Sequence, residues 1–301
     1  MNGMDDRQVR DIEIELTGRC NLRCPLCAST VFPDRTGRPN QRELSEWTTQ
    51  LDRYSGLKSV CISGICSEPT LYSDIVGLLD YFVSRGVTIE LYTNASTHDE
   101  EWWHGLGRHL TDKDLVVFTV CGSTDEIHGK YRVGQDLQTV LRNAMAFKMD
   151  NHNGNDCIQH ISFRYNEDDF KKNMKPIISM FSKRMLIKTP PYCERFHCGF
   201  EGSGICTAGN DGKMYMALIS DTLRRKRLGN FKIDCMSKKK RFLTLDQFGN
   251  EYPCFLYRLF SNDRFDKRDY SRIDGFEYDF CHDCETRMSA MMKMFGVEDM
   301  I

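Results

Sequence analysis

Short apolar runs alternate with segments of helical periodicity along the first 190 residues. Residues 11–17 alternate polar and apolar side chains as a strand does, and residues 59–63 form a short apolar run typical of a buried strand. The same patterns predict further strands at 87–92, 115–121, 160–164 and 185–188. This alternation predicts an α/β fold whose parallel strands are joined by right-handed crossovers. The pattern alone does not separate an open doubly wound sheet from a barrel.

Helices are predicted between these strands where apolar positions recur three and four residues apart. One such helix has Ile75, Leu78 and Phe82 on one face, with Ser73 as its expected N-cap and Gly86 at its end. Others are expected around residues 137–144 and after Pro176.

The composition changes after about residue 190, where glycines, cysteines and basic residues crowd together and helical periodicity fades. Residues 242–254 combine an alternating strand, a turn at 247–250 and a return strand, which predicts a β-hairpin. We therefore expect two domains, residues 1–190 and residues 191–301.

The overall composition excludes several classes of protein. Of 301 residues, 41 are basic and 43 acidic, so charge gives no sign of a nucleic acid or an anionic membrane as partner. We find no run of about 18 apolar residues, and the N-terminal segment is too polar for a signal peptide. Fourteen cysteines without a secretory signal argue for metal binding in a reducing compartment. We therefore expect a cytoplasmic protein.

The first chemical motif is a C-x3-C-x2-C spacing formed by Cys20, Cys24 and Cys27 after the first predicted strand. Three thiolates this close together can converge on one metal centre, and iron–sulfur clusters are held by such thiolates. Three ligands for four irons leave one iron open to a further ligand. A zinc site is the alternative, but zinc prefers four closed ligands, and no nearby histidine or fourth cysteine completes the set.

With this motif the chain resembles the radical S-adenosylmethionine (SAM) superfamily. The signature of that family is the same spacing after the first strand of a partial (β/α)6 barrel of TIM type. The resemblance implies a [4Fe–4S] cluster on Cys20, Cys24 and Cys27, whose fourth iron binds SAM. Leu26 stands where the family often has an aromatic residue.

Later segments resemble the SAM-binding parts of the same family. Residues 63–70 are similar to its Gly-Gly-Glu-Pro segment, with Cys66 and Ser67 in place of the glycines, and residues 93–95 are similar to its Thr-Asn-Gly turn. The stretch from Val120 to Arg132 is similar to members with C-terminal cluster domains. All follow strands, so we expect them on one face of a barrel. The SAM-binding residues implied by the resemblance are Ser67, Glu68, Thr93, Asn94, Thr119 (ribose), Arg164 (SAM carboxylate, or else a surface ion pair) and Asn166.

A second cysteine set lies near the C-terminus and consists of Cys235, Cys254, Cys281 and Cys284. The predicted hairpin would bring the first two together, and four thiols suffice for a closed [4Fe–4S] or zinc site. The spacing resembles the SPASM/Twitch domains of radical SAM enzymes. Because no cysteine follows Cys284, the single-cluster Twitch type fits better. The resemblance therefore implies one auxiliary [4Fe–4S] cluster in residues 191–301.

Other cysteines and two basic runs leave alternatives open. Cys193, Cys198 and Cys206 lie in a glycine-rich segment, where one could replace Cys235 as a ligand, donate a hydrogen atom, or have no function. The two basic runs are residues 224–227 and 238–241. One alternative is that they face an acidic or phosphorylated substrate, and the other is that they form a solvent-exposed surface without that role.

The resemblance implies an enzyme that cleaves SAM reductively to methionine and a 5′-deoxyadenosyl radical, which abstracts hydrogen from a substrate. A second cluster suits a net oxidation, so we expect an oxidoreductase that dehydrogenates a small molecule such as a sugar or aminocyclitol. The short chain before the first strand and the basic runs favour this substrate class. The alternative is oxidative cross-linking or epimerisation of a ribosomal peptide. The sequence assigns no catalytic residue.

The expected partners are this small-molecule or peptide substrate and an electron donor such as flavodoxin or ferredoxin, without membrane or nucleic acid. A different class is a non-catalytic zinc protein that binds nucleic acid through its basic C-terminal half. The Glu68-Pro69 and Thr93-Asn94 segments argue against that class.

Overall fold

The computed structural model describes residues 5–25, 27–31, 41–64, 67–151, 156–161, 163–181, 184–188 and 242–252. Its strands are β1 (Asp11–Ile14), β2 (Ser59–Ile62), β3 (Thr88–Thr93), β4 (Leu115–Thr119), β5 (Asp156–Ile161), β6 (Arg184–Lys188), β7 (Phe242–Leu245) and β8 (Glu251–Tyr252). Its helices are α1 (Ala28–Val31), α3 (Leu44–Leu51), α4 (Ile75–Ser84), α5 (Glu100–His109), α6 (Asp125–Tyr131), α7 (Leu137–Asp150), α8 (Glu167–Asn173) and α9 (Lys175–Ser179). Short 3-10 helices are η1 (Asp6–Gln8), η2 (Pro69–Leu71) and η3 (Arg164–Asn166).

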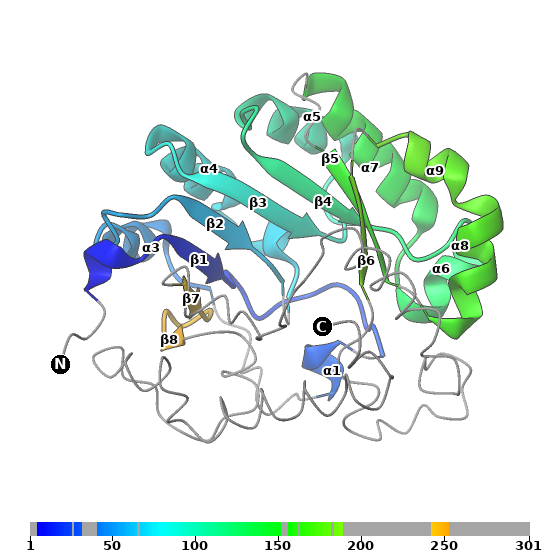
Figure 1. Cartoon of the computed structure of the whole chain (residues 1–301), viewed down its shortest axis with the longest axis horizontal. Coiled ribbons are helices and arrows are strands. Elements are labelled where there is room, and N and C mark those ends of the chain that lie inside the picture. Colours follow the sequence, from blue (N-terminus) through cyan, green and yellow to red (C-terminus); the bar gives the residue numbers. More distant parts are fainter. Residues whose placement is uncertain are drawn as a thin grey trace, which may run out of the picture.

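The strands form one curved sheet in the order β6-β5-β4-β3-β2-β1-β7-β8. Every neighbouring pair is parallel except β7 with β8, which is antiparallel. Helices α3 to α9 lie along the outer side of the arc, as a partial barrel requires, whereas α1 lies on the other side of the sheet (Figure 1). The predicted α/β partial barrel is therefore confirmed, and the open question between a doubly wound sheet and a barrel is decided for the barrel.

The two faces of the sheet differ in polarity. Apolar side chains such as Ile12, Ile89 and Phe118 join the core between sheet and helices and are at most 1% exposed. Burial of one such side chain contributes about 1.5 to 3 kcal/mol. The alternate positions face the inside of the arc and include polar groups, for example Glu13 and Glu90. The inner face is thus the one that offers polar contacts to a ligand.

The predicted helix around residues 75–82 is confirmed as α4, whose buried side chains include Ile75, Leu78 and Phe82. Its N-cap is Asp74, not Ser73, so the predicted cap was wrong by one residue. Gly86 follows the helix in the left-handed region, with a φ of 67°. The fifth strand was predicted at 160–164, but β5 runs from Asp156 to Ile161.

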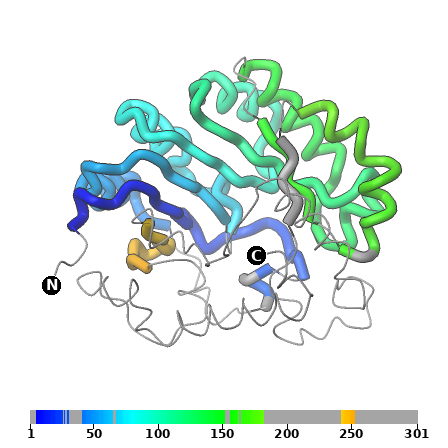
Figure 2. Tube along the Cα trace, in the orientation of Figure 1, coloured from blue at the N-terminus to red at the C-terminus, as the bar shows by residue number. Residues whose placement is uncertain are grey.

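The predicted hairpin is confirmed as β7 and β8, and it extends the barrel sheet. Strand β7 pairs with β1 in parallel, with Asp11 opposite Phe242 and Ile14 opposite Leu245. In Figure 2 the hairpin and the N-terminal strand, far apart in sequence, accordingly lie side by side. The boundary between residues 190 and 191 stays a prediction, because residues 189–241 lie outside the described residues.

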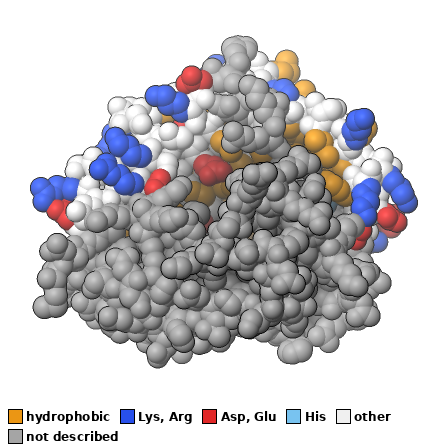
Figure 3. Space-filling model, in the orientation of Figure 1, with side chains coloured by type: hydrophobic (Ala, Val, Ile, Leu, Met, Phe, Trp, Pro, Cys, Tyr) orange, Lys and Arg blue, Asp and Glu red, His pale blue; other side chains and the backbone are white. Residues whose placement is uncertain are grey.

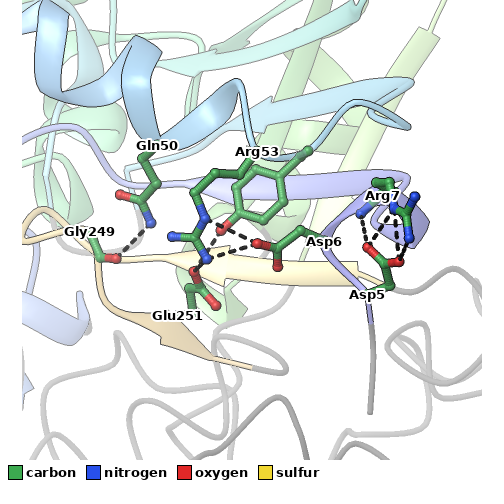
Figure 4. A network of polar contacts seen from close by, with 8 residues as sticks. Asp5, Asp6, Arg7, Gln50, Arg53, Gly249 and Glu251 are labelled. Carbon is green, nitrogen blue, oxygen red and sulfur yellow. Dashed lines mark hydrogen bonds and ion pairs between the residues drawn. The ribbon is translucent and has the colours of Figure 1, made fainter. Parts of the chain in front are cut away.

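Polar contacts fix this hairpin to helix α3 and to the N-terminal segment (Figure 4). The Gln50 amide donates to the carbonyl of Gly249 at 2.9 Å. The guanidinium of Arg53 reaches Asp6 at 2.9 Å and Glu251 at 3.3 Å. Three segments distant in sequence are thereby joined at one edge of the barrel.

On the face shown in Figure 3, basic and acidic side chains lie interspersed along the described rim. Within the described ranges, the structure contains no helix whose length and apolar character would let it cross a membrane.

Candidate active site

The loop between β1 and α1 carries Cys20, Cys24 and Cys27, and all three belong to one small cluster of side chains. Cys24 is 6% exposed, and the other two are half-buried. The amide of Cys27 donates to the carbonyl of Cys24 at 3.1 Å, which turns the loop back on itself. The apolar neighbours of the three thiols are Leu22, Cys121, Tyr131, Ile161, Phe163 and Tyr165.

Each of the three sulfurs accepts a hydrogen bond. The Leu22 amide donates to Cys20 at 3.4 Å, and the Ser29 hydroxyl donates to Cys27 at 3.2 Å. The guanidinium of Arg132 donates to Cys24 at 3.6 Å. Donors placed on sulfur stabilise thiolates that bind metal. Within the described ranges no three His, Cys, Asp or Glu side chains are grouped closely enough to hold a single metal ion. The three thiols thus share one cluster of side chains without forming a site for a single ion.

Burial controls the protonation of two of these thiols, Cys20 and Cys24. It raises the pKa of Cys20 and of Cys24 to about 11, so both are protonated near pH 7 before metal binds. Arg132 opposes this effect at Cys24 by lowering its pKa. Metal must therefore displace protons when it binds here.

Glu68 ties the segment after β2 to the end of β3. Its carboxylate accepts from the Thr93 hydroxyl at 2.6 Å, the Asn94 amide at 2.7 Å and the Thr70 hydroxyl at 2.8 Å. The Glu68 amide donates to the carbonyl of Arg19 in the cysteine loop at 2.8 Å. Glu68 is 2% exposed, and these bonds engage both of its carboxylate oxygens within the protein. The segment is therefore held by Glu68 against both neighbouring loops.

Asn94 connects the Glu68 hydrogen bonds to the cysteine loop. Its side-chain amide donates to Asn21 at 2.9 Å and lies 3.9 Å from the sulfur of Cys20. The next residue, Ala95, has a φ of 56°, in the left-handed region that favours glycine. The Ala95 amide donates back to the hydroxyl of Thr93 at 2.9 Å. A tight turn after β3 thus places Asn94 against the cysteine loop.

The remaining predicted SAM-binding residues lie along the carboxyl edge of the sheet. Ser67 is 7% exposed and donates to Glu15 at 3.4 Å. Thr119 is 5% exposed and accepts from the Gln159 amide at 3.2 Å. The carbonyl oxygen of that Gln159 side chain is buried and has no partner among the described residues. It is an open acceptor on the inner face, close to Thr119.

Asn166 joins the ends of β4 and β5. It is fully buried, and its amide donates to the carbonyls of Cys121 at 2.9 Å and Ile161 at 3.0 Å. Arg164 belongs to η3, but its side chain lies outside the described residues. The predicted ligands Cys235, Cys254, Cys281 and Cys284 and the segment residue Cys66 lie there as well.

Residues 14–175, more than half of the chain, match the family model described as the Radical SAM superfamily. The chain belongs to the radical SAM superfamily. It is therefore a radical SAM enzyme, whose cofactors are a [4Fe–4S] cluster and SAM.

Two curated relatives match shorter segments of this radical SAM enzyme. It is 34% identical over 84 residues to the PqqA peptide cyclase of Bradyrhizobium diazoefficiens, which covers 27% of this chain and 21% of that protein. It is 26% identical over 107 residues to the tungsten-containing aldehyde ferredoxin oxidoreductase cofactor-modifying protein of Pyrococcus furiosus, covering 36% and 29%. The matched segments thus span less than a third of either relative.

Solved structures show the same fold. Streptococcus suis SuiB bound to its precursor peptide SuiA has a TM-score of 0.64 at 16% identity, covering 92% of this chain and 64% of that one. The structure of anSMEcpe with bound AdoMet has a TM-score of 0.58 at 17% identity, covering 91% and 82%. At these identities the likeness describes the fold alone.

The residues present fit the cofactors of the family. Three thiols with hydrogen-bond donors suit the cluster, and the open acceptor of Gln159 beside Thr119 suits a ligand with donor groups of its own, as SAM has. One part of the site was not recognised from sequence. Gln135 bonds to both Arg132 and His128, but its position in the sequence carries no signal of its own.

Proposed function

We propose that this radical SAM enzyme holds its cluster through Cys20, Cys24 and Cys27 and abstracts hydrogen from a substrate bound on the inner face of the barrel. The contact of Asn94 with the cysteine loop and with Glu68 carries this proposal, because it joins the ends of three neighbouring strands at one place. When bound, the reduced cluster and SAM supply methionine and a 5′-deoxyadenosyl radical.

The chain's own residues position these groups. Glu68 fixes residues 67–70, so that Ser67 and the backbone beside it can face the amino group of SAM, which donates and needs acceptors. Thr119 and the side-chain oxygen of Gln159, which has no partner among the described residues, offer contacts to the ribose hydroxyls. Asn166 and Arg164 complete the proposed set at the end of β5. Asn166 acts there by holding the β4 and β5 ends together.

We propose that Cys235, Cys254, Cys281 and Cys284 hold an auxiliary [4Fe–4S] cluster in a Twitch-like domain of residues 191–301. The sequence spacing supports it, and so does the hairpin β7–β8, which ends two residues before Cys254 and is fixed to α3. A second cluster suits a net oxidation, because it offers an acceptor for an electron that the substrate gives up.

In place of the small molecule expected first from the sequence, we propose as substrate a peptide that undergoes oxidation. The relative that is 34% identical over 84 residues is named a PqqA peptide cyclase, and this favours a peptide. A sugar or aminocyclitol is the alternative substrate class. An electron donor of the flavodoxin or ferredoxin type would reduce the first cluster.

Two buried cysteines of the same side-chain cluster allow a matched test of the ligand assignment. Cys24 is a proposed ligand, whereas Cys121 follows β4 and is fully buried without that role. Both serine variants are reconstituted without oxygen and reduced with dithionite in the presence of SAM, and 5′-deoxyadenosine is measured by chromatography. We expect Cys24→Ser to form none above background and Cys121→Ser to stay active. Full activity in Cys24→Ser would refute the assignment.

The substrate class is tested with deuterium. A lysate of cells grown in D2O is separated into a peptide fraction and a small-molecule fraction, and each is incubated with the reconstituted enzyme and SAM. Deuterium should enter 5′-deoxyadenosine with the peptide fraction. Transfer from the small-molecule fraction alone would replace the peptide by the alternative class.

A further inference from the structure

Arg132 lies directly after α6, beside the cysteine loop. Its Nη1 donates to Cys24 Sγ at 3.6 Å, and its Nε donates to the side-chain oxygen of Gln135 at 3.0 Å. The ion pairs among the described residues do not include Arg132. Its guanidinium therefore donates hydrogen bonds to a thiol and an amide, and no carboxylate among the described residues forms an ion pair with it.

A buried network holds this guanidinium in place. The Gln135 oxygen also accepts from Nε2 of His128 at 3.0 Å, and Nδ1 of His128 accepts from the Cys121 amide at 3.1 Å. Because a backbone amide can only donate, Nδ1 carries no proton and Nε2 carries the ring proton. His128 is fully buried and Gln135 is 9% exposed. The orientation of Gln135, and with it that of Arg132, is thus fixed from the end of β4.

The same network reaches a second thiol. The Gln135 amide donates to the carbonyl of Asn94, whose own side-chain amide lies 3.9 Å from Cys20 Sγ. Among the described donors to the three sulfurs, Arg132 carries a charge, whereas the Leu22 amide, the Ser29 hydroxyl and the Asn94 amide are neutral. Among these donors, the strongest electrostatic effect is therefore that of Arg132 on Cys24.

We propose that Arg132 is a positioning residue that sets the reduction potential of the cluster, with Gln135 and His128 holding it. This inference rests on the proposed role of Cys20, Cys24 and Cys27 as ligands. Reduction adds negative charge to the cluster, and hydrogen bonds and positive charge at the sulfurs stabilise the reduced state. Loss of Arg132 should therefore make the cluster harder to reduce.

The test compares wild type, Arg132→Gln, Arg132→Lys and the control Arg108→Gln. Arg108 is largely exposed and pairs with Asp150 on the outer helices. Each reconstituted protein is analysed for iron and then titrated potentiometrically, following the part of the electron paramagnetic resonance signal that changes when SAM is added. Since only the SAM-binding cluster responds, its potential is separated from that of an auxiliary cluster.

We expect Arg132→Gln to lower the ratio of reduced to oxidised cluster about tenfold at a fixed potential, which is 59 mV for one electron. Arg132→Lys keeps the charge and should shift less, and Arg108→Gln should not shift. An unchanged potential in Arg132→Gln, or an equal shift in both Arg132 variants, would overturn the inference. A wild-type protein that assembles no cluster would instead refute the proposed function.

A second variant, Gln135→Ala, tests the inference in the case that Arg132→Gln does not assemble the SAM-binding cluster. If Arg132→Gln keeps only about four of the expected eight irons and so lacks the SAM-binding cluster, Gln135→Ala is measured in the same way, since it keeps Arg132 but removes the group that holds it. A shift in the same direction supports the inference. An unchanged potential overturns it. Loss of the SAM-binding cluster in both variants overturns it as well, because these residues would then be needed for the structure of the cysteine loop and not for the reduction potential.

Discussion

The Glu68 carboxylate offers the sharpest test of how the site is held together. Replacement by glutamine keeps the shape of the side chain but removes its charge and turns one oxygen into a donor. In the native chain one oxygen accepts from Thr70 (amide 3.3 Å, hydroxyl 2.8 Å) and from the Thr93 hydroxyl, while the other accepts from the Asn94 amide. Both threonine hydroxyls can rotate to accept instead, whereas neither backbone amide can.

The magnitude follows from these four bonds. Glutamine should turn its oxygen toward the Asn94 amide, which leaves the buried Thr70 amide without an acceptor at a cost of about 1 to 3 kcal/mol. Charge-assisted bonds are roughly twice as strong as neutral ones, so the Asn94 bond weakens by about 1 kcal/mol. We expect Glu68→Gln to lose about 3 kcal/mol of unfolding free energy, which is roughly 5 °C in melting temperature for a chain of 301 residues.

The assay is thermal unfolding of the reconstituted protein without oxygen, followed by hydrogen exchange of the segment that contains Asn94. The control is Glu101→Gln, whose side chain is 85% exposed and faces Arg108 at 3.8 Å. An exposed pair of this kind contributes about 0 to 1 kcal/mol, so the control should melt close to wild type. If Glu68→Gln has the same melting temperature as the control, and the Asn94 amide exchanges its hydrogen no faster than in wild type, then Glu68 does not hold the segment after β2 to the end of β3.

Three further predictions follow from backbone strain and buried histidines. Gly249 has a φ of 79°, and a Cβ there would stand 2.3 Å from an arginine nitrogen. Gly249→Ala should therefore cost about 2 kcal/mol in chemical denaturation, whereas Gly86→Ala, with φ of 67° and open space, should cost about 1 kcal/mol. Ala95→Gly should change the unfolding free energy by less than about 1 kcal/mol. The glycine relieves the strain of the left-handed backbone, but it removes a buried methyl group and increases the entropy of the unfolded chain, so these effects offset each other. Burial lowers the pKa of His128 and of His160 to about 4. In the unfolded chain each histidine has a pKa of about 6.5, so between pH 4 and 6.5 the unfolded state binds more protons than the folded state. Each histidine should therefore lower the unfolding free energy by about 2 kcal/mol at pH 5 relative to pH 7. Equal midpoints of urea unfolding at the two pH values would contradict this.

The sheet could be predicted because buried parallel strands are short apolar runs separated by periodic helices. Strand β5 was placed four residues late because Gln159 and His160 sit inside it, polar in sequence yet 8% and 0% exposed. Helix α5 was not predicted at all. It contains Gly105 and Gly107, and the latter is needed because a Cβ would stand 2.5 Å from the Phe147 carbonyl on α7.

The structure brings together those predicted site residues whose spacing along the chain carries the chemistry. The cysteine motif, Glu68 and Asn94 each lie within one local segment after a strand, and parallel strands bring such segments to one edge. The Arg132–Gln135 arrangement depends instead on how the end of α6 packs on the cysteine loop, where the Arg23 amide donates to the Val133 carbonyl at 3.0 Å. A contact of this kind between distant segments leaves no periodicity or spacing in the sequence.

The most direct test of the central claim is the metal content and SAM cleavage of one pair of proteins. Wild type and a variant with Cys20, Cys24 and Cys27 all replaced by alanine are purified and reconstituted without oxygen. The account predicts about eight irons in wild type, about four in the variant, and 5′-deoxyadenosine from wild type alone after dithionite reduction. Stoichiometric zinc, no iron after reconstitution and no SAM cleavage would contradict it.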